Sequence, residues 1–528
     1  MKFHNNAVRD KRTRFYLPVQ KILRSNEVKN PEILIGNQEY QTTIHYLNTM
    51  MEMPPQSSIL LDFGYALHGG LRINEYSHGG LMEISLGESV SECINESNQD
   101  CSRKRDCIML PNCGMLEYGN TVFRFVQLKN VSEETFNIQN VLAVALERDI
   151  EVAGFFESSD PLLNQIWQTA IRTVHLCMQD YLYDGAKRDR IIWMGDMHPE
   201  MHGILCAFND TSIIRDSFEF LMRQATADKP MNGRFYTYNC WFIISMWEYY
   251  LATGDKEFLQ KHASYIKVML DLYSTFVASD GRECIPETRF LDWPNQDNEQ
   301  AKHAGLQALL LWMMRDGEKL LQILGLDSSR TATAQKLLLT HQPDPAGRKA
   351  PAALLTMTGL KDCSDVLQQN PFSDVSTFYG YYVLQAQPTV PALELIRRYW
   401  GGMLDMGATS FWEDFDINWM QNACRIDEIP CPGKKDIHAD YGNYCYKGLR
   451  HSLSHGWSCG PAPFMSERIL GIKFLAPGGR HIAVKPDLGD LEYVRGAIPT
   501  PHGNITVEAD KSGKLKVDAP QGTVIEKS

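Results

Sequence analysis

Acidic, basic and aromatic side chains are concentrated in residues 183–196 of the sequence. The acids are Asp184, Asp189 and Asp196, and a single indole, Trp193, lies among them. Carboxylates bind hydroxyl groups and transfer protons, and an indole covers the apolar face of a sugar ring. The segment is therefore typical of a carbohydrate site, although an ion-paired helix start would have a similar composition.

A second cluster, residues 406–416, places Glu413 among Phe411, Trp412 and Phe415, directly after a predicted helix. Aromatic surroundings remove water from a carboxylate, which disfavours its ionisation and raises its pKa. The alternative is a surface loop whose aromatic side chains pack inward while Glu413 faces water. The residues alone favour neither interpretation.

Two shorter stretches carry the same kinds of side chain. Asp292 lies beside Trp293, and His455 lies in a polar stretch that runs into a predicted helix. Both have a structural alternative, because Pro294 would stiffen its loop and a lone histidine is more often structural than catalytic. These two stretches support a functional site only in combination with the two larger clusters.

The chain around these clusters has helical periodicity from about residue 158 to residue 469. Apolar residues recur every three or four positions from Leu162 to Val174, after a Ser-Asp-Pro start signal. If residues 189–196 were also helical, Asp189, Trp193 and Asp196 would share one face. Further helices are predicted over residues 197–208, 211–225, 239–253, 256–277, 298–323, 331–341, 350–359, 375–387, 391–404 and 455–469. Uneven loops and the lack of a fixed-period repeat favour a closed ring of helical hairpins over a solenoid.

The two ends of the chain predict β structure, because short apolar or alternating runs are separated by Gly, Asn and Pro. We assign residues 1–152 to an N-terminal β-sandwich, 153–470 to a helical catalytic domain and 471–528 to a C-terminal β-sandwich. Residues 422–446 are a polar segment that interrupts the helical pattern. They predict either a lid over the site or a plain surface insertion.

Composition limits the classes of partner. The 528 residues are too many for one hydrophobic core. With 52 basic and 64 acidic residues the net charge is −12, which argues against nucleic acid and anionic membranes as partners. No run of eighteen apolar residues predicts a membrane span, and the polar N-terminus predicts no secretory signal.

The 13 cysteines are scattered, without a disulfide framework or a zinc spacing. They are interpreted as mostly free thiols in a reducing compartment, so a cytoplasmic location is expected. No metal site is recognised. The oligomeric state stays open, with a homodimer as one option.

In order and spacing the clusters resemble the motifs of the family 78 α-L-rhamnosidases. Residues 184–196 are similar to that family's Asp-Cys-Pro-x-Arg-Glu-Arg-x-x-Trp-x-Gly-Asp, and residues 407–413 to its Gly-Ala-Thr-Thr-x-Trp-Glu. Asp292-Trp293 resembles its Gly-Asp-Trp, and residues 453–455 resemble its Leu-Asn-His. Segments in both predicted sandwiches are also similar, so the resemblance covers nearly the whole chain.

The resemblance implies a multidomain, mainly α-helical protein with an (α/α)6-barrel catalytic domain between two β-sandwiches. It also implies inverting, exo-acting release of terminal α-L-rhamnose from small glycosides or oligosaccharides, without a cofactor. Asp189 would be the general acid and Glu413 the general base, roughly 6.5–9.5 Å apart so that a water molecule fits between acid, sugar and base. The residues implied to bind the sugar are Asp184, Arg188, Trp193, Asp196, Asp292, Trp293, Trp412 and His455.

Two departures from the family pattern stand out. Gly185-Ala186 replaces Cys-Pro, and Asp189 stands where the family has Glu. The shorter side chain withdraws the proton donor by ~1 Å, a displacement that costs on the order of 10²-fold in rate. Either the backbone moves inward, or Asp184 or Glu200 donates the proton, or the activity has changed. The alternatives are an exo-glycosidase of the same fold for another sugar and a non-catalytic carbohydrate-binding relative.

Overall fold

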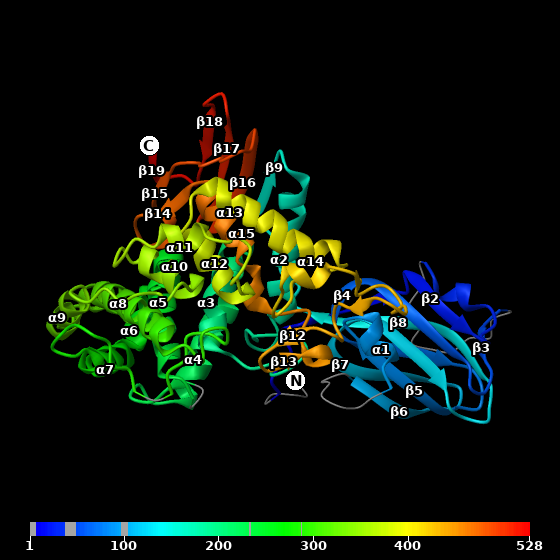
Figure 1. Ribbon diagram of the computed structural model, residues 1–528. Coiled ribbons are helices and arrows are strands. Elements are labelled where there is room, and N and C mark those ends of the chain that lie inside the picture. The colour runs from blue at the N-terminus through cyan, green and yellow to red at the C-terminus, as the bar shows by residue number, and fades with distance from the viewer. Residues whose placement is uncertain (1–6, 37–48, 97–103, 232–233, 287, 528) are drawn as a thin grey trace, which may run out of the picture.

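The protein has a central helical region flanked by two β-rich regions (Figure 1). The structure is a computed structural model that describes residues 7–36, 49–96, 104–231, 234–286 and 288–527. None of the helices in these ranges combines the length and the hydrophobicity that a membrane span needs. The predicted arrangement, a mainly helical centre between β-rich ends, is confirmed.

The N-terminal region is an antiparallel sheet in the order β1-β8-β4-β7-β5-β6, with β2 on β4 and β3 on β8. Alternate residues of the long strand β4 explain its position: Ile59, Leu61 and Phe63 enter the main core of the sheet, and Leu60 packs toward Val90 of the short helix α1. The elements are β1 Thr13–Pro18, β2 Lys21–Asn26, β3 Met51–Met53, β4 Ser58–Glu75, β5 Gly80–Gly87, α1 Val90–Ile94, β6 Lys104–Leu110, β7 Gly114–Asn130 and β8 Phe136–Glu147.

The central helices lie where the periodicity predicts them. Helix α2 begins at Pro161 because the Asp160 carboxylate accepts hydrogen bonds from the amides of Leu162 and Leu163, at 2.9 and 3.4 Å. The larger helices are α2 Pro161–Cys177, α3 Met194–Ala207, α4 Ser212–Gln224, α5 Tyr236–Thr253, α7 Ala263–Tyr273, α8 Glu299–Leu324, α9 Ser329–Leu338, α10 Lys349–Met357 and α12 Thr377–Gln385. Shorter ones are α6 Lys256–Lys261, α11 Ser364–Gln368, α13 Thr389–Leu395, α14 Gly401–Asp405 and α15 Pro461–Phe464.

The C-terminal region consists of a four-stranded sheet, β18-β17-β16-β9, and a three-stranded sheet, β14-β15-β19. Strand β9 (Phe155–Ser158) precedes α2 in the chain, yet it pairs antiparallel with β16 (Tyr493–Thr500). The start of the helical region therefore completes the C-terminal sheet. The other strands are β14 Ile472–Phe474, β15 His481–Val484, β17 Gly503–Asp510, β18 Leu515–Asp518 and β19 Val524–Lys527.

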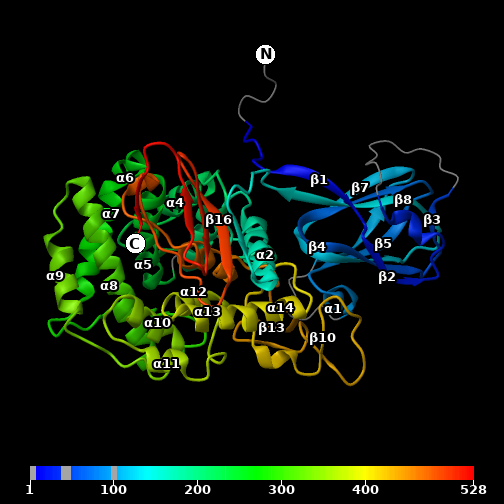
Figure 2. The same cartoon turned by 90° about the horizontal axis from the view of Figure 1, so that it is seen from above.

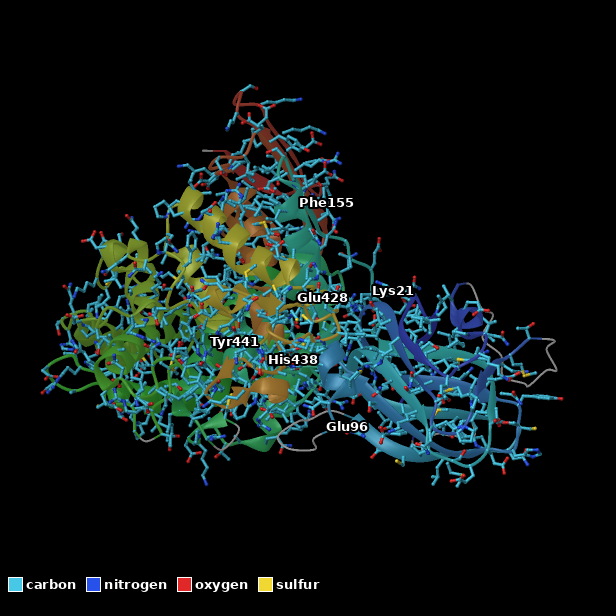
Figure 3. All side chains as sticks on the ribbon, turned by 45° about the vertical axis from the view of Figure 1, so that its right-hand side comes forward. Lys21, Glu96, Phe155, Glu428, His438 and Tyr441 are labelled. Atoms are coloured by element: carbon cyan, nitrogen blue, oxygen red, sulfur yellow. The ribbon has the colours of Figure 1, made fainter. Side chains whose placement is uncertain are left out.

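Residues 422–446 join the helical region to the N-terminal sheet (Figures 2 and 3). Their anchor is the start of α1: the Val90 amide donates to the Ile426 carbonyl at 2.8 Å, and the Ser89 hydroxyl bonds His438 Nδ1 at 2.7 Å. Within the segment the regular structure is two short strand pairs, β10 (Ala423–Cys424) with β11 (Lys435–Asp436) and β12 (Gly442–Asn443) with β13 (Tyr446–Lys447). The segment is thus a packed connection between two regions.

Candidate active site

The two main sequence clusters meet at a cavity of about 290 Å³ beside the start of α3. Eight of the ten predicted site residues line this cavity: Asp184, Arg188, Asp189, Trp193, Asp196, Trp293, Glu413 and His455. Seven further residues complete the lining: Arg234, Phe235, Tyr238, Phe290, Cys445, Arg450 and Trp457. Segments that are more than two hundred residues apart in the chain therefore form one polar, aromatic site.

The segment before α3 is not helical, so the expectation that Asp189, Trp193 and Asp196 share a helical face is wrong. Helix α3 begins at Met194, and of the three only Asp196 lies inside it. The cause is pairing with a distant segment: Gly185 forms a β-bridge with His455, and the Gly456 amide donates to the Asp184 carbonyl at 2.8 Å. These bonds hold residues 184–186 extended against residues 454–456.

This pairing also explains why glycine occupies position 185. A Cβ atom there would lie 2.8 Å from Nδ1 of the His455 imidazole. The family's cysteine at this position would therefore collide with the histidine ring in this arrangement. Glycine in place of the family's cysteine therefore allows the two segments to lie this close together.

Asp189 has a left-handed backbone, with φ of 55°, and so does Arg190. Aspartate is among the few residues other than glycine that adopt this conformation readily, and glutamate is less suited to it. The shorter acid thus fits its local backbone. Its carboxylate is 40% exposed and lies 3.2 Å from Nη1 of Arg188.

Arg188 connects the two predicted catalytic carboxylates. Its Nη1 contacts Asp189, its Nη2 donates to Glu413 Oε1, and its Nε donates to the Arg450 carbonyl at 3.0 Å. Glu413 is buried, and its Oε2 accepts a hydrogen bond from the Ser452 amide at 3.2 Å. Burial raises the pKa of Glu413, and the Arg188 guanidinium offsets part of that rise.

Asp184 and Asp196 are buried without a cation in contact among the described residues. Burial raises the pKa of each well above its ordinary value, and their mutual repulsion adds to the rise for Asp184. Asp184 Oδ1 accepts from the Ile191 amide at 3.1 Å, and Asp196 Oδ1 lies 3.3 Å from His455 Nε2. Burial also lowers the pKa of His455 well below its ordinary value, so its imidazole is neutral. These carboxyl and imidazole groups can exchange hydrogen bonds with sugar hydroxyls.

Asp196 Oδ2 is buried, yet it has no hydrogen-bond partner among the described residues. An unpaired buried oxygen beside a cavity is a position that a ligand hydroxyl can satisfy. The ligand atoms of Asp184, Asp196 and His455 lie within 4.8 Å of one another, so these three side chains could also hold a metal ion.

Aromatic rings form the apolar wall of the cavity. Trp193 packs edge-on against Tyr238 with the ring centroids 5.7 Å apart, and Phe290 packs against Trp293 at 5.2 Å. On another side, the Trp457 indole donates from Nε1 to the Glu413 carbonyl at 3.0 Å. Flat apolar surfaces beside carboxyl groups are the combination that sugar rings require.

Two of the predicted residues lie outside the cavity lining. Asp292 is buried and accepts hydrogen bonds from the Asn295 amide and side chain, at 3.1 and 2.7 Å, so it closes a turn. Trp412 is 1% exposed and packs edge-on against Phe415. Glu200, the alternative proton donor, is buried beneath Gly456 and does not line the cavity either.

The lining residues that the sequence interpretation missed are of two kinds. Phe290 and Trp457 are each two positions from a predicted residue, so the motifs themselves carried a signal for them. Arg234 and Phe235 belong to a segment without any motif, and no sequence pattern marks them. Cys445 shows that the connection formed by residues 422–446 reaches the edge of the cavity.

Comparisons with known proteins agree with this architecture. Residues 151–327 match the family model described as the bacterial alpha-L-rhamnosidase six-hairpin glycosidase domain. No curated protein matches the chain. The GH78 rhamnosidase of Bacillus sp. GL1 has a similar structure, with a TM-score of 0.73 and 18% identity over 92% of this chain and 54% of that one.

Two structures solved with bound sugar are also similar. The Klebsiella oxytoca rhamnosidase with rhamnose bound has a TM-score of 0.69 and 18% identity, over 86% of this chain and 96% of that one. The Streptomyces avermitilis alpha-L-rhamnosidase complexed with L-rhamnose has a TM-score of 0.71 and 16% identity, over 89% of this chain and 48% of that one. This chain thus spans about half the length of the Bacillus and Streptomyces enzymes. Residues 151–327 thus match the six-hairpin glycosidase domain of the bacterial alpha-L-rhamnosidases, and the chain shares the fold of the solved rhamnosidases.

Proposed function

We propose that the protein is an exo-acting, inverting hydrolase that releases terminal α-L-rhamnose from small glycosides or oligosaccharides, on helices that close into an (α/α)6 barrel between two β-sandwiches. One observation carries the proposal. Asp189 and Glu413 line the same cavity, together with two buried acids whose pKa values are raised and an aromatic wall. The volume of about 290 Å³ lies at the low end of ligand pockets and suits one sugar residue at a chain end.

Glu413 is suited to the role of general base. Hydrogen bonds from Arg188 and the Ser452 amide favour its carboxylate form, while burial keeps its pKa above the ordinary value. A base with a raised pKa accepts the proton of an attacking water more readily than an exposed carboxylate does. Glu413 would activate a water molecule on the face of the sugar opposite the departing group.

Asp189 would protonate the glycosidic oxygen. Its partly exposed position at the edge of the cavity is where a leaving group would depart toward solvent. Because Arg188 contacts both carboxylates, the guanidinium can stay with Glu413 when the substrate displaces it from Asp189. This displacement would free the Asp189 carboxyl group to contact the glycosidic oxygen.

Asp184 is the acid to test against Asp189. It lines the cavity, and burial raises its pKa well above the ordinary value, so it retains a proton to higher pH than an exposed aspartate does. Glu200 is also buried with a raised pKa, but it lies outside the lining and cannot reach a glycosidic oxygen there. The choice of proton donor is therefore between two residues of the same loop.

A panel of 4-nitrophenyl glycosides, assayed with wild type and Glu413→Gln, tests the proposal. We expect release from the α-L-rhamnoside and a loss of kcat on the order of 10²–10⁴-fold in the variant, because the base is removed. Proton NMR of the first-formed rhamnose should show the β-anomer, since inversion changes the α configuration of the substrate. Asp414→Asn is the matched control, because Asp414 is the adjacent buried acid and lies outside the cavity lining.

The outcomes separate the alternatives. An unchanged rate in Glu413→Gln would exclude Glu413 as the base. Hydrolysis of another glycoside, with none of the rhamnoside, would keep the glycosidase and replace the sugar. Rhamnose binding without turnover of any substrate would leave a carbohydrate-binding relative.

We also propose that the enzyme acts inside the cell on imported glycosides. The twelve described cysteines are free thiols, and even the sulfur atoms of Cys424 and Cys431, 3.5 Å apart, are not bonded to each other. Free thiols are stable in a reducing compartment. Immunodetection in separated cell fractions tests this location.

A further inference from the structure

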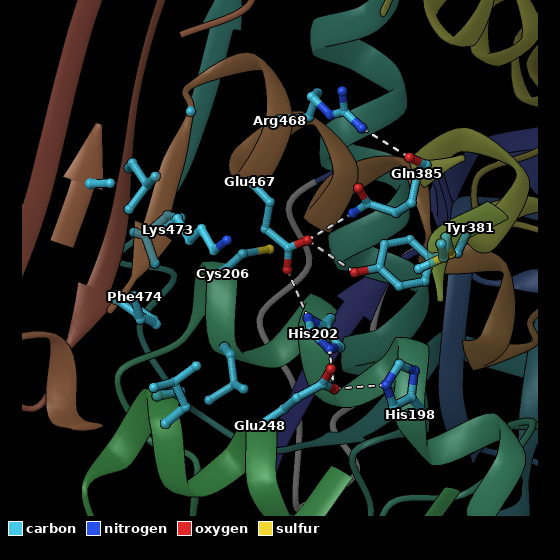
Figure 4. Close-up of a pocket in the computed structure, with 18 of the residues that line it drawn as sticks. His198, His202, Cys206, Glu248, Tyr381, Gln385, Glu467, Arg468, Lys473 and Phe474 are labelled. Carbon is cyan, nitrogen blue, oxygen red and sulfur yellow. Dashed lines mark hydrogen bonds and ion pairs between the residues drawn. The ribbon is translucent and has the colours of Figure 1, made fainter. Parts of the chain in front are cut away.

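A second, larger cavity lies between the helices and the C-terminal sheets, away from the sugar site. It has a volume of about 710 Å³, and residues of α3, α5, β14 and β15 line it. Figure 4 shows His198, His202, Glu248 and Glu467 in contact at its inner surface. None of these four residues lines the cavity that contains Glu413.

Three potential metal-ligand atoms converge on one point in this cluster. His198 and His202 are four residues apart on α3, so both rings project from one helix face. Glu248 on α5 accepts at a single oxygen, Oε2, from His198 Nε2 at 2.7 Å and from His202 Nε2 at 2.9 Å. All three ligand atoms lie within 4.8 Å of one another.

The outward-facing nitrogens of both histidines have partners as well. His202 Nδ1 bonds Glu467 Oε1 at 2.7 Å, and His198 Nδ1 bonds the Tyr382 hydroxyl at 2.8 Å. Glu467 is itself held by the Tyr381 hydroxyl at 3.0 Å. A carboxylate behind a histidine is the arrangement that orients imidazoles toward metal ions.

We propose that His198, His202 and Glu248 bind a divalent transition-metal ion, with zinc as the ion that fits best. Two imidazoles and one carboxylate are a common zinc ligand set with an open fourth position, and tetrahedral ligands at ~2.0 Å from zinc lie about 3.3 Å apart. The shared oxygen and the two Nε2 atoms are at 2.7 and 2.9 Å, so each separation need widen by only about half an ångström. The ion would take the place of the two hydrogens through which Nε2 of His198 and Nε2 of His202 now bond Glu248 Oε2.

Charge and access support a divalent cation. Glu248 and Glu467 carry two negative charges, which a divalent ion and two neutral imidazoles would balance. The Glu467 side chain is 32% exposed and the Glu248 side chain 18%, so the site opens from this side into the cavity. His198, at 1% exposure, closes the opposite side.

A second histidine–glutamate cluster in the described chain provides a matched comparison. His303 bonds Glu283 through Nδ1 at 2.7 Å and His341 through Nε2 at 2.9 Å. The composition is the same, two histidines and one glutamate, but the partners lie on opposite edges of one ring. Their ligand atoms do not converge, so this cluster should bind no ion.

The test is metal titration of the full chain after removal of bound metal with a chelator. Competition with a chromophoric chelator should show one tight equivalent of Zn²⁺, and Co²⁺ should give the visible absorption of a tetrahedral nitrogen–oxygen site. His202→Asn should abolish this equivalent, and Glu467→Gln should weaken it about 10–100-fold, because Glu467 orients the imidazole. The second variant keeps the test decisive if the first fails to fold.

Two controls locate the site. His303→Asn should keep the equivalent, and so should Asp196→Asn, which alters the group of Asp184, Asp196 and His455 that could also hold an ion. Loss of the equivalent in either control, or a wild-type chain without it, would overturn the proposal.

Discussion

Helix α3 contributes side chains to two buried polar sites. Burial raises the carboxyl pKa at one site, and histidine partners lower it at the other. At the first turn of α3, Asp196 faces the cavity that Glu413 lines, which is called the sugar cavity below. Asp184 lines the same cavity, and no cation contacts either acid in the described structure. Two and six residues further along the helix, His198 and His202 face Glu248 and are hydrogen-bonded to it. Both sites are buried, so burial alone does not explain the difference.

The difference lies in the partners. An isolated buried acid stays protonated, because its charge has no compensation, and the pKa of Asp196 is accordingly raised well above its ordinary value. The pKa of Glu248 is instead held far below its usual range by two histidines that overcome the cost of burial. The first arrangement leaves an oxygen, Asp196 Oδ2, without a partner and open to a ligand. In the second arrangement, Glu248 Oε2 is hydrogen-bonded to Nε2 of both His198 and His202.

Asp189 differs from Asp184 and Asp196 at the same cavity, because its side chain is partly exposed and contacts the Arg188 guanidinium. We expect Asp189→Asn to lower kcat on the order of 10²–10⁴-fold for glycosides with poor leaving groups, since these require protonation. Nitrophenyl substrates should change much less, because nitrophenolate departs without a proton. Asparagine also tolerates the left-handed backbone, so the loop should keep its shape.

The measurement is kcat against leaving-group acidity for wild type, Asp189→Asn and Asp184→Asn. Only the variant that lacks the proton donor should show a steep dependence. A steep line for Asp184→Asn and a flat one for Asp189→Asn would assign the acid to Asp184. Asp189 would then have no part in proton donation.

At the other site, removal of one partner should destabilise the fold. Glu248→Gln leaves the two histidines without their shared carboxylate, and breaking a buried ion pair from one side costs about 3–5 kcal/mol. Urea unfolding of the metal-free protein measures this loss. Glu133→Gln, at an exposed glutamate between β7 and β8, should change the free energy of unfolding by less than about 0.5 kcal/mol. Equal effects in the two variants would show that the cluster at Glu248 contributes no stability.

The helices were predictable because amphipathic periodicity is a local property of the sequence. The predicted helices over 211–225 and 298–323 are α4 and α8 with boundaries moved by one residue. The predicted helix over 256–277 is divided at His262 and ends in a short turn. The motifs also placed eight site residues in one cavity.

What the sequence could not provide depends on partners far along the chain. Residues 184–186 are extended because they pair with residues 454–456, and strand β9 exists because β16 lies beside it. The four-residue spacing of His198 and His202 is visible in the sequence, but Glu248 comes from the next long helix. Convergence of such side chains requires the packed structure, so no metal site was recognised from the sequence.

The unpaired acids at the sugar cavity should make the fold less stable as pH rises. Between the pKa of Asp196 in the unfolded chain, near 3.8, and its raised pKa in the fold, the folded state binds more protons than the unfolded state. The free energy of unfolding therefore decreases with rising pH through this range, by at most about 1.4 kcal/mol per pH unit for each such group. The favourable contribution is complete below pH ~4 and is lost as pH rises toward the folded pKa.

Asp196→Asn removes one of these groups while keeping the shape of the side chain. Relative to wild type, we expect the variant to gain stability steadily from pH 4.5 to pH 7.5 in urea unfolding experiments. Asp271→Asn, which alters a partly exposed acid on α7 paired with Lys267, is the control for loss of a carboxyl group outside the cavity. A constant difference between Asp196→Asn and wild type would mean that Asp196 is ionised in the fold. The carboxyl at the start of α3 would then bind a sugar hydroxyl only as an acceptor, and the contrast between the two sites along the helix would rest on hydrogen bonding alone.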